Sequence, residues 1–226
     1  MIDLYYHFGP NPTKIVLFLE EAGLPYKLVP VDTFKGDQFT PEFTRLNPNN
    51  KVPVIVDDGI VVFDSSAILI HLGEKSGQFY PVGTAEERAE LRSWLMFAAT
   101  GLGPYCGQAV HFRHFAPEPK DYAVNRYMFE ARRHYAILDD RLSEREWIVN
   151  GQYSIVDMAV WGWTRNIDFI LGADARQEYP SLMAFVDRIS ERPAGRVAAS
   201  LRDSGVFKQS YDQEAHDHMY RHGGTQ

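Results

Sequence analysis

The sequence predicts two folded parts within its 226 residues, an α/β domain of order β-α-β-α-β-β-α and an all-helical region. Short apolar strands and helices alternate through the first 80 residues. From about residue 84 to 196 only apolar runs of helical period occur. Pro81-Val82-Gly83-Thr84 is a natural linker between the two. We therefore expect an α/β domain, a helical domain and a polar tail, at 1–80, 85–200 and 201–226.

The first elements follow from their residue patterns. Residues 2–6 alternate as a strand does, and Pro12 suits the first turn of an apolar helix that ends at Gly23. Residues 27–31 read as a second strand, and Pro41 begins a short helix. Because two consecutive strands joined through a helix pair in parallel, this first β-α-β unit must cross over with a right hand.

The next elements are a hairpin and a helix. A third strand begins at the pair Val52-Pro53, a turn at 57–59 leads into a fourth, and that strand stops at Asp64-Ser65. The whole domain is therefore expected to contain a mixed sheet of four strands.

The Val52-Pro53 pair also suggests a ligand site. Proline cannot donate to a strand ladder, so Pro53 has a structural role at the first residue of the strand. If the bond is cis, Val52 could aim its N–H and C=O outward. Asp64-Ser65 would hold a helix N-terminus that attracts a carboxylate. A peptide-like anionic ligand suits both features, and a tight turn followed by an ordinary N-cap is the alternative.

The helical region has one clear landmark. Ser154 and Asp157 fit the N-cap and N3 positions of a capping box, which makes both residues structural. The helix that they open is apolar nearly all round, as a helix surrounded by others should be. A glycine-rich stretch at 101–107 is expected to break a helix. Candidate helices are 85–100, 120–142, 154–171 and 181–191.

Composition excludes several classes of function. The net charge of −7 makes nucleic acid an unsuitable partner, and the pI near 5.6 suits a cytoplasmic protein. There is no run of 18 apolar residues and no signal-peptide pattern, so we expect no membrane association. No histidine set is completed by cysteine or carboxylate, so no metal is expected. The single cysteine, Cys106, excludes an internal disulfide and a Cys-x-x-Cys centre.

The order of elements, with a proline opening the third strand, resembles a thioredoxin-like domain. The acidic-Ser pair after the fourth strand resembles the glutathione-binding half of a glutathione transferase. The segments 1–32, 41–58 and 63–77 most resemble the bacterial nu class of that family, whose members are glutathione-dependent disulfide-bond reductases. The similarity covers roughly residues 1–200. It implies a glutathione transferase fold, a homodimer, and glutathione as co-substrate, as one or two molecules or as glutathione disulfide.

The resemblance also implies how the thiol is activated. Free glutathione has a thiol pKa of about 8.5, so near neutral pH the protein must favour the thiolate. The nu class uses a Thr and an Asn, at positions that match Gly9 and Asn11 here. The Asn11 amide can donate to a thiolate, with N–H groups of the helix sharing the load. Gly9 supplies no hydroxyl, which leaves the second donor open among Thr13, Tyr5 and Tyr6.

Other ligand contacts carry over by position. The resemblance assigns the glycyl end of glutathione to Gln38 and Lys51, the cysteinyl unit to the backbone of Val52, the γ-glutamyl group to Asp64 and Ser65, and a second glutathione to Arg126. A solvated loop is the alternative for Gln38 and Lys51. A surface ion pair is the alternative for Arg126, with Arg133 as its substitute two turns further along the same face.

These observations favour a glutathione-dependent thiol-disulfide oxidoreductase that reduces disulfides or organic peroxides. Two alternatives remain. One is conjugation of glutathione to an electrophile, which differs only in the second pocket. The other is a non-catalytic glutathione-binding protein on the same fold, which the missing hydroxyl at Gly9 favours.

Overall fold

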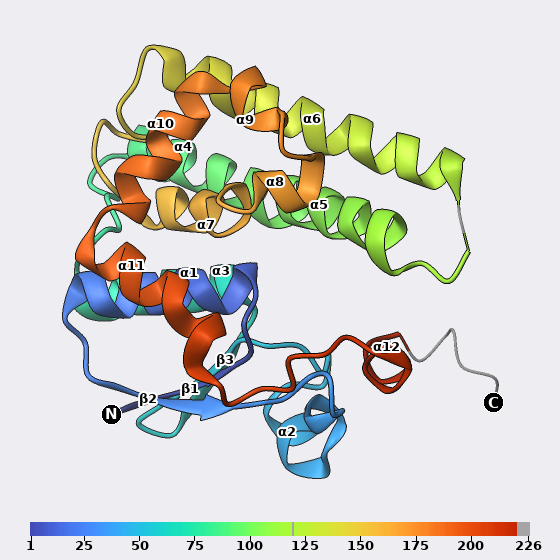
Figure 1. The fold of residues 1–226 in the computed structure, drawn as a ribbon. Coiled ribbons are helices and arrows are strands. Elements are labelled where there is room, and N and C mark those ends of the chain that lie inside the picture. The colour runs from blue at the N-terminus through green and yellow to red at the C-terminus, as the bar shows by residue number, and fades with distance from the viewer. Residues whose placement is uncertain (119, 221–226) are drawn as a thin grey trace. The chain divides into compact units, whose positions relative to one another are not determined.

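The computed structural model describes residues 1–118 and 120–220, and Figure 1 shows the course of the chain. The chain forms two compact units. Unit 1 is Met1–Leu72 together with the chain from Arg196 onward, and unit 2 is Gly73–Gly195. The part of the expected tail that precedes residue 221 therefore groups with the first unit, and residues 221–226 lie outside the described residues.

Unit 1 contains the expected mixed sheet of four strands. Its strands are β1 Ile2–Tyr6, β2 Tyr26–Pro30, β3 Val54–Asp57 and β4 Ile60–Phe63, in the spatial order β2-β1-β3-β4. β1 pairs in parallel with β2 and antiparallel with β3, which pairs antiparallel with β4. Asp58 and Gly59 connect β3 to β4, and both have positive φ, 49° and 90°, as a two-residue hairpin requires.

The remaining elements of the N-terminal region and of the C-terminal segment are helical. They are α1 Pro10–Ala22, η1 Asp37–Phe39, α2 Pro41–Leu46, α3 Ser65–Ser76, α11 Pro193–Ala199, η4 Ser200–Ser204 and α12 Gln213–Met219. α1 begins two residues before Pro12, because Pro10 also fits a first turn that needs no N–H donor. It ends at Gly23 as predicted, in the left-handed conformation with φ 63°.

α1 buries a lysine in its apolar stretch. Residues 15–19 of this helix are fully buried, and Lys14 beside them is only 3% exposed. Burial lowers the pKa of the Lys14 ammonium from 10.5 to about 8, and the Asp64 carboxylate opposes that shift. The helix therefore carries a cation whose charged form is destabilised by the fold.

The described residues of unit 2 form helices and no strand, as predicted. After the end of α3 they are α4 Ala85–Met96, η2 Phe97–Leu102, α5 Gly103–Val110, η3 His111–Phe115, α6 Asp121–Ser143, α7 Ile155–Thr164, α8 Ile167–Leu171, α9 Ala175–Glu178 and α10 Pro180–Ser190. The helix predicted at 154–171 is divided between α7 and α8. Among the described residues, no helix has both the length and the apolar character that crossing a membrane requires.

The expected helix break at 101–107 is wrong. The chain is helical from α4 to the end of η3, with two π-helical stretches in place of a break. The glycines allow side chains of neighbouring helices to pack closely against this helical stretch. A Cβ at Gly101 would lie 2.4 Å from Nε2 of His134, and one at Gly103 would lie 2.9 Å from Nε1 of Trp163. Glycine thus lets these helices approach each other without breaking them.

The capping box of α7 is confirmed. Oδ2 of Asp157 accepts hydrogen bonds of 2.8 Å from the N–H and from the hydroxyl of Ser154, and the Ser154 hydroxyl accepts from the N–H of Val156. Oδ1 of Asp157 also accepts from the N–H of Ile148 at 2.9 Å, a contact that the motif did not predict. Burial raises the pKa of Asp157 to about 7 in spite of these donors.

Replacing Asp157 with Ala should lower the free energy of unfolding by about 2–4 kcal/mol, because two buried N–H groups and a hydroxyl lose their acceptor. Urea unfolding followed by circular dichroism measures this loss. Asp168 is the matched control, an exposed aspartate in the first turn of α8. Its replacement with Ala should change stability by less than about 0.5 kcal/mol. Equal losses in the two variants would contradict the structural role of Asp157.

Replacing Lys14 with Met should stabilise the protein near pH 7 by about 3 kcal/mol, since the buried ammonium is removed. The unfolded chain keeps the lysine proton up to a pKa of 10.5, whereas the folded chain releases it near 8. Stability therefore rises with pH between these two values, and the gain from Met should disappear above them. Thermal melting of both proteins between pH 6 and 11 measures how this gain in stability depends on pH. The exposed Lys27 replaced with Met is the control, and a gain independent of pH would refute the effect of burial.

Candidate functional site

The loop between β1 and α1 holds the predicted thiol site. The Gly9 carbonyl accepts hydrogen bonds from the N–H of Thr13, at 3.2 Å, and from its hydroxyl, at 2.6 Å. Thr13 is 3% exposed, so its hydroxyl is used within the helix. Tyr6 is also buried, with its ring edge-on to Phe207 at 5.1 Å between centroids. Neither residue is available as the missing second donor.

The Tyr5 ring packs beside the Phe43 ring of α2, with centroids 6.2 Å apart. Asn11 is therefore the side-chain donor that is left at the entrance of α1. It is partly exposed, and no group among the described residues bonds to its side-chain amide. Pro10 and Pro12 have no N–H, so only Asn11 carries one among the first three residues of the helix. The two prolines reduce the number of helix N–H groups that can contact a ligand at this end of α1. Asn11 supplies both a side-chain amide and a backbone N–H at this turn.

The second part of the predicted site is the loop before β3. The Val52-Pro53 bond is cis, the geometry on which the sequence argument depended. The Asn47 side chain holds this loop, since its amide donates to the carbonyl of Lys51 at 2.7 Å and its oxygen accepts from the N–H of Asn49 at 2.9 Å. Among the described residues, the backbone N–H and C=O of Val52 have no hydrogen-bond partner. Val52 thus offers one backbone donor and one acceptor, which a peptide ligand can pair.

The third part is the N-terminus of α3. Asp64 has a left-handed backbone with φ 70°, a conformation that aspartate tolerates better than most residues. Its Oδ1 accepts from the N–H groups of Ser66 and Ala67, at 2.8 and 3.2 Å, so the carboxylate caps the helix. The Ser65 hydroxyl has no partner among the described residues. The site therefore offers Ser65 as a free donor, while Asp64 is already engaged through one oxygen.

Gln38 and Lys51 differ in their exposure. Lys51 is exposed, as a residue in a solvated loop would be, whereas Gln38 is only 4% exposed. The Gln38 amide donates to the carbonyls of Thr33 and His218, both at 3.4 Å, and its Oε1 has no partner. His218 belongs to the C-terminal segment, which no local sequence pattern places here. Gln38 is therefore covered by its own chain rather than open to solvent.

Arg126 lies in unit 2, where the ion pair that was its alternative has formed. Its Nη1 donates to Oε1 of Glu130 at 2.6 Å, while Nε of Arg133 donates to Oε2 of the same carboxylate at 2.9 Å. These bonds hold the pKa of Glu130 below its usual range. Both arginine side chains stay about half exposed. Two guanidinium groups on one carboxylate leave a net positive charge, so contact with a second glutathione stays a prediction.

The protein's own thiol takes no part in the chemistry. Cys106 is fully buried, and burial raises the pKa of its thiol far above the ordinary value. Within residues 1–118 and 120–220, no three His, Cys, Asp or Glu side chains gather as ligands of a metal would. Any reactive thiol must therefore come from a ligand.

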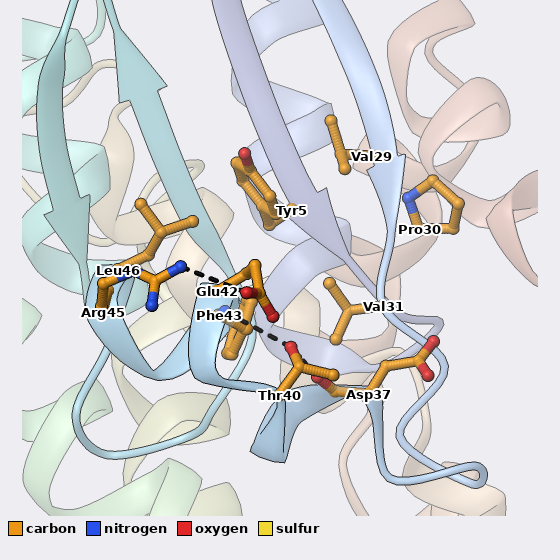
Figure 2. Close-up of a pocket in the computed structure, with 10 residues that line it drawn as sticks. All are labelled: Tyr5, Val29, Pro30, Val31, Asp37, Thr40, Glu42, Phe43, Arg45 and Leu46. Atoms are coloured by element: carbon orange, nitrogen blue, oxygen red, sulfur yellow. Dashed lines mark hydrogen bonds and ion pairs between the residues drawn. The ribbon is translucent and has the colours of Figure 1, made fainter.

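The structure also contains a hollow that the sequence did not predict. It has a volume of about 390 Å³ and lies in unit 1. Figure 2 shows Tyr5, Val29 and Val31 of the β1 and β2 region facing Phe43 of α2. None of the predicted glutathione contacts lines this hollow. It does share Val31 and Phe43 with the apolar cluster against which Val52 packs.

The geometry agrees with comparisons to known proteins. The family model for the glutathione S-transferase N-terminal domain matches residues 8–75, and that for the C-terminal domain matches residues 97–193. The chain is 46% identical over 206 residues to the disulfide-bond oxidoreductase YfcG of Escherichia coli strain K12. That match covers 86% of this chain and 92% of the relative.

Two solved structures share the fold at a similar level. A glutathione transferase family member from Pseudomonas fluorescens, with two glutathione bound, has a TM-score of 0.82 and 37% identity over 87% of this chain and 91% of that chain. A glutathione transferase from Pseudomonas putida, with one glutathione disulfide bound per subunit, has a TM-score of 0.83 and 34% identity over 90% and 92%. The chain therefore belongs to the glutathione S-transferase family.

Proposed function

We propose that this protein is a nu-class glutathione-dependent thiol-disulfide oxidoreductase, which reduces small disulfides or organic peroxides. The observation that carries the proposal is the turn at Asn11. It presents two unpaired donors where a ligand's thiolate would lie, while the protein's own cysteine is buried. The name of the Escherichia coli relative, a disulfide-bond oxidoreductase, and the glutathione disulfide bound to the Pseudomonas putida protein support the same reaction.

Glutathione would be held along its backbone. The N–H and C=O of Val52 would pair with its cysteinyl unit, and Lys51 would face the glycyl carboxylate. Ser65 would donate to the γ-glutamyl carboxylate, while the oxygen of Asp64 that does not cap α3 would accept from the γ-glutamyl amine. Gln38 would lie at the glycyl end. In this arrangement the thiol would lie at Asn11, whose donors would lower the thiol pKa by stabilising the anion.

The reaction would proceed by thiol-disulfide exchange. The glutathione thiolate attacks one sulfur of a disulfide, forming a mixed disulfide and releasing a thiolate that takes up a proton. A second glutathione attacks the mixed disulfide, which yields glutathione disulfide and the second thiol. With an organic peroxide, the thiolate attacks the O–O bond and releases an alcohol, which leaves glutathione sulfenic acid. A second glutathione then attacks that sulfur, releases water and forms glutathione disulfide. Arg126, or Arg133 beside it, would contact the second glutathione through its carboxylates.

Two other functions are compatible with the same site. Conjugation to an electrophile needs the same thiolate and differs only in the second substrate. A non-catalytic binding protein is favoured by the absence of a hydroxyl at Gly9, since Thr13 does not replace it.

Replacing Asn11 with Ala should lower kcat/KM for glutathione-dependent reduction of a small disulfide by about 10²–10³, because the amide is the free side-chain donor of this turn and only backbone N–H groups remain. The pKa of bound glutathione, followed by thiolate absorbance against pH, should rise in the same variant. Replacing Ser65 with Ala should weaken binding, measured by calorimetry, and leave the pKa of the bound thiol unchanged. Replacing the exposed Asn49 with Ala is the control.

The same assays distinguish the alternatives. Conjugation of a nitroaromatic faster than disulfide reduction would favour the conjugating enzyme. Tight binding of glutathione with no thiolate in the wild type would favour the binding protein. Thiolate absorbance that survives Asn11→Ala but is lost in Tyr6→Phe would replace the proposal with a tyrosine-type transferase.

We also propose that the protein is a cytoplasmic homodimer, with family domains at 1–80 and 85–200. β4 is an edge strand of the sheet, and three of its four side chains are exposed apolar groups, Ile60, Val61 and Phe63, at 58, 42 and 44%. An exposed apolar edge strand promotes association unless it is covered. A second copy of the chain would cover it.

Replacing Phe63 with Glu should therefore convert the dimer to a monomer, because a charge on this edge would be buried in the interface. Light scattering after size exclusion measures the mass. The exposed Val197 of α11 replaced with Glu is the control and should leave the mass unchanged. A dimer that persists in the Phe63 variant would place the interface elsewhere.

A further inference from the structure

The C-terminal strap, residues 200–220, is an ordered part of unit 1. Phe207 is its central contact and is 4% exposed. Its ring lies 5.1 Å from the ring of Tyr6, 4.5 Å from that of His7 and 5.8 Å from that of Phe8. The guanidinium of Arg202, also in the strap, lies over the ring of Phe8 at 5.4 Å. These residues immediately precede the Gly9–Asn11 turn, so the strap packs against the base of the proposed thiol site.

A buried carboxylate fixes the strap after Phe207. Asp32 is 5% exposed, and its Oδ2 accepts from the N–H of Lys208 at 2.8 Å. Its Oδ1 accepts from the N–H of Phe34 at 3.1 Å and lies 3.7 Å from Nε2 of His7. Asp32 therefore connects the strap, the loop after β2 and the loop before α1 at one point.

The far end of the strap covers the proposed glycyl subsite. The His218 carbonyl accepts from the Gln38 amide, and the His218 ring lies so close to Gly36 that a Cβ there would be 2.7 Å from its Nδ1. Gly36 also has φ 83°, which glycine adopts without strain. Figure 1 shows α12 close to α2 in this part of unit 1. The two bonds that the Gln38 N–H groups donate are long at 3.4 Å, so a ligand carboxylate would be a stronger acceptor for them than the carbonyl of the strap.

We propose that the strap limits how far a ligand can extend beyond the glycyl end of glutathione, and so selects glutathione over derivatives that are lengthened there. The inference rests on the proposed function, which assigns Gln38 to that end. Atoms attached to the glycyl carboxylate would need the space that α12 and His218 occupy beside Gln38 and Gly36. A short group would fit beside the strap, and a long one would have to displace it, with loss of the Phe207 and Asp32 contacts.

Esters of the glycyl carboxylate test this directly. Methyl, ethyl and butyl esters all lack the carboxylate charge, so differences among them report the available space and not the contact with Lys51. Calorimetric titration of the wild type should show that affinity falls by about tenfold or more from the methyl to the butyl ester. In Phe207→Ala the strap is released, and the affinities for the three esters should agree to within about twofold.

Matched variants separate the strap from general instability. Val206 precedes Phe207 in the strap and is 51% exposed, so Val206→Ala should keep the steep dependence on ester length. Lys208→Pro removes the N–H that donates to Asp32 and leaves the aromatic cluster intact. It should likewise make the affinities for the three esters nearly equal. Hydrogen exchange should be faster at residues 205–220 in both released variants and unchanged in α1.

The outcomes are distinct. A length dependence that is equal in wild type, Phe207→Ala and Lys208→Pro would overturn the selective role of the strap. The selective role would also be overturned if the wild type binds glutathione but has the same affinity for all three esters. Failure of the wild type to bind glutathione at all would instead overturn the proposed function, on which the selectivity depends.

Discussion

The proposed glutathione site depends on backbone and side-chain groups that the fold leaves unpaired. Most buried polar groups in a folded protein find partners within it, so donors and acceptors that stay free are informative. In unit 1 they are the Asn11 amide, the backbone of Val52 and the Ser65 hydroxyl. The groups around them are paired within the chain, for example the Thr13 hydroxyl to Gly9. These unpaired groups are the ones that the proposed function assigns to contacts with glutathione.

Prolines contribute to this selection by removing competing donors. Pro10 and Pro12 delete two of the N–H groups at the start of α1, which concentrates the remaining donors on Asn11. Asparagine supplies an amide donor that does not titrate, whereas a tyrosine or cysteine at the same place would have its own pKa. On the proposed function, the absence of a hydroxyl at Gly9 makes the activation of the thiol depend on Asn11.

Buried aspartates organise both units in the same way, by collecting N–H donors from segments that are distant in sequence. Asp157 joins the start of α7 to the loop at Ile148, and Asp32 joins three parts of unit 1, including the strap. A buried carboxylate is costly unless it accepts several hydrogen bonds. Each of these aspartates therefore needs hydrogen bonds from several segments at once. For Asp32 these contacts connect the strap to the loop that precedes the proposed thiol site.

Local patterns in the sequence determined the order of elements, the hairpin, the mixed sheet and the capping box at Ser154 and Asp157. Each depends on residues within a few positions, so turn chemistry and apolar period suffice to predict it. The same patterns predicted a break at residues 101–107, where glycine serves packing against His134 and Trp163 instead. For Gln38 they left a solvated loop as the alternative to a ligand contact. Only the tertiary structure decided that α12, 180 residues away, covers it. Contacts between distant segments depend on the shape and the unpaired groups of the folded surface, and a local sequence pattern contains neither.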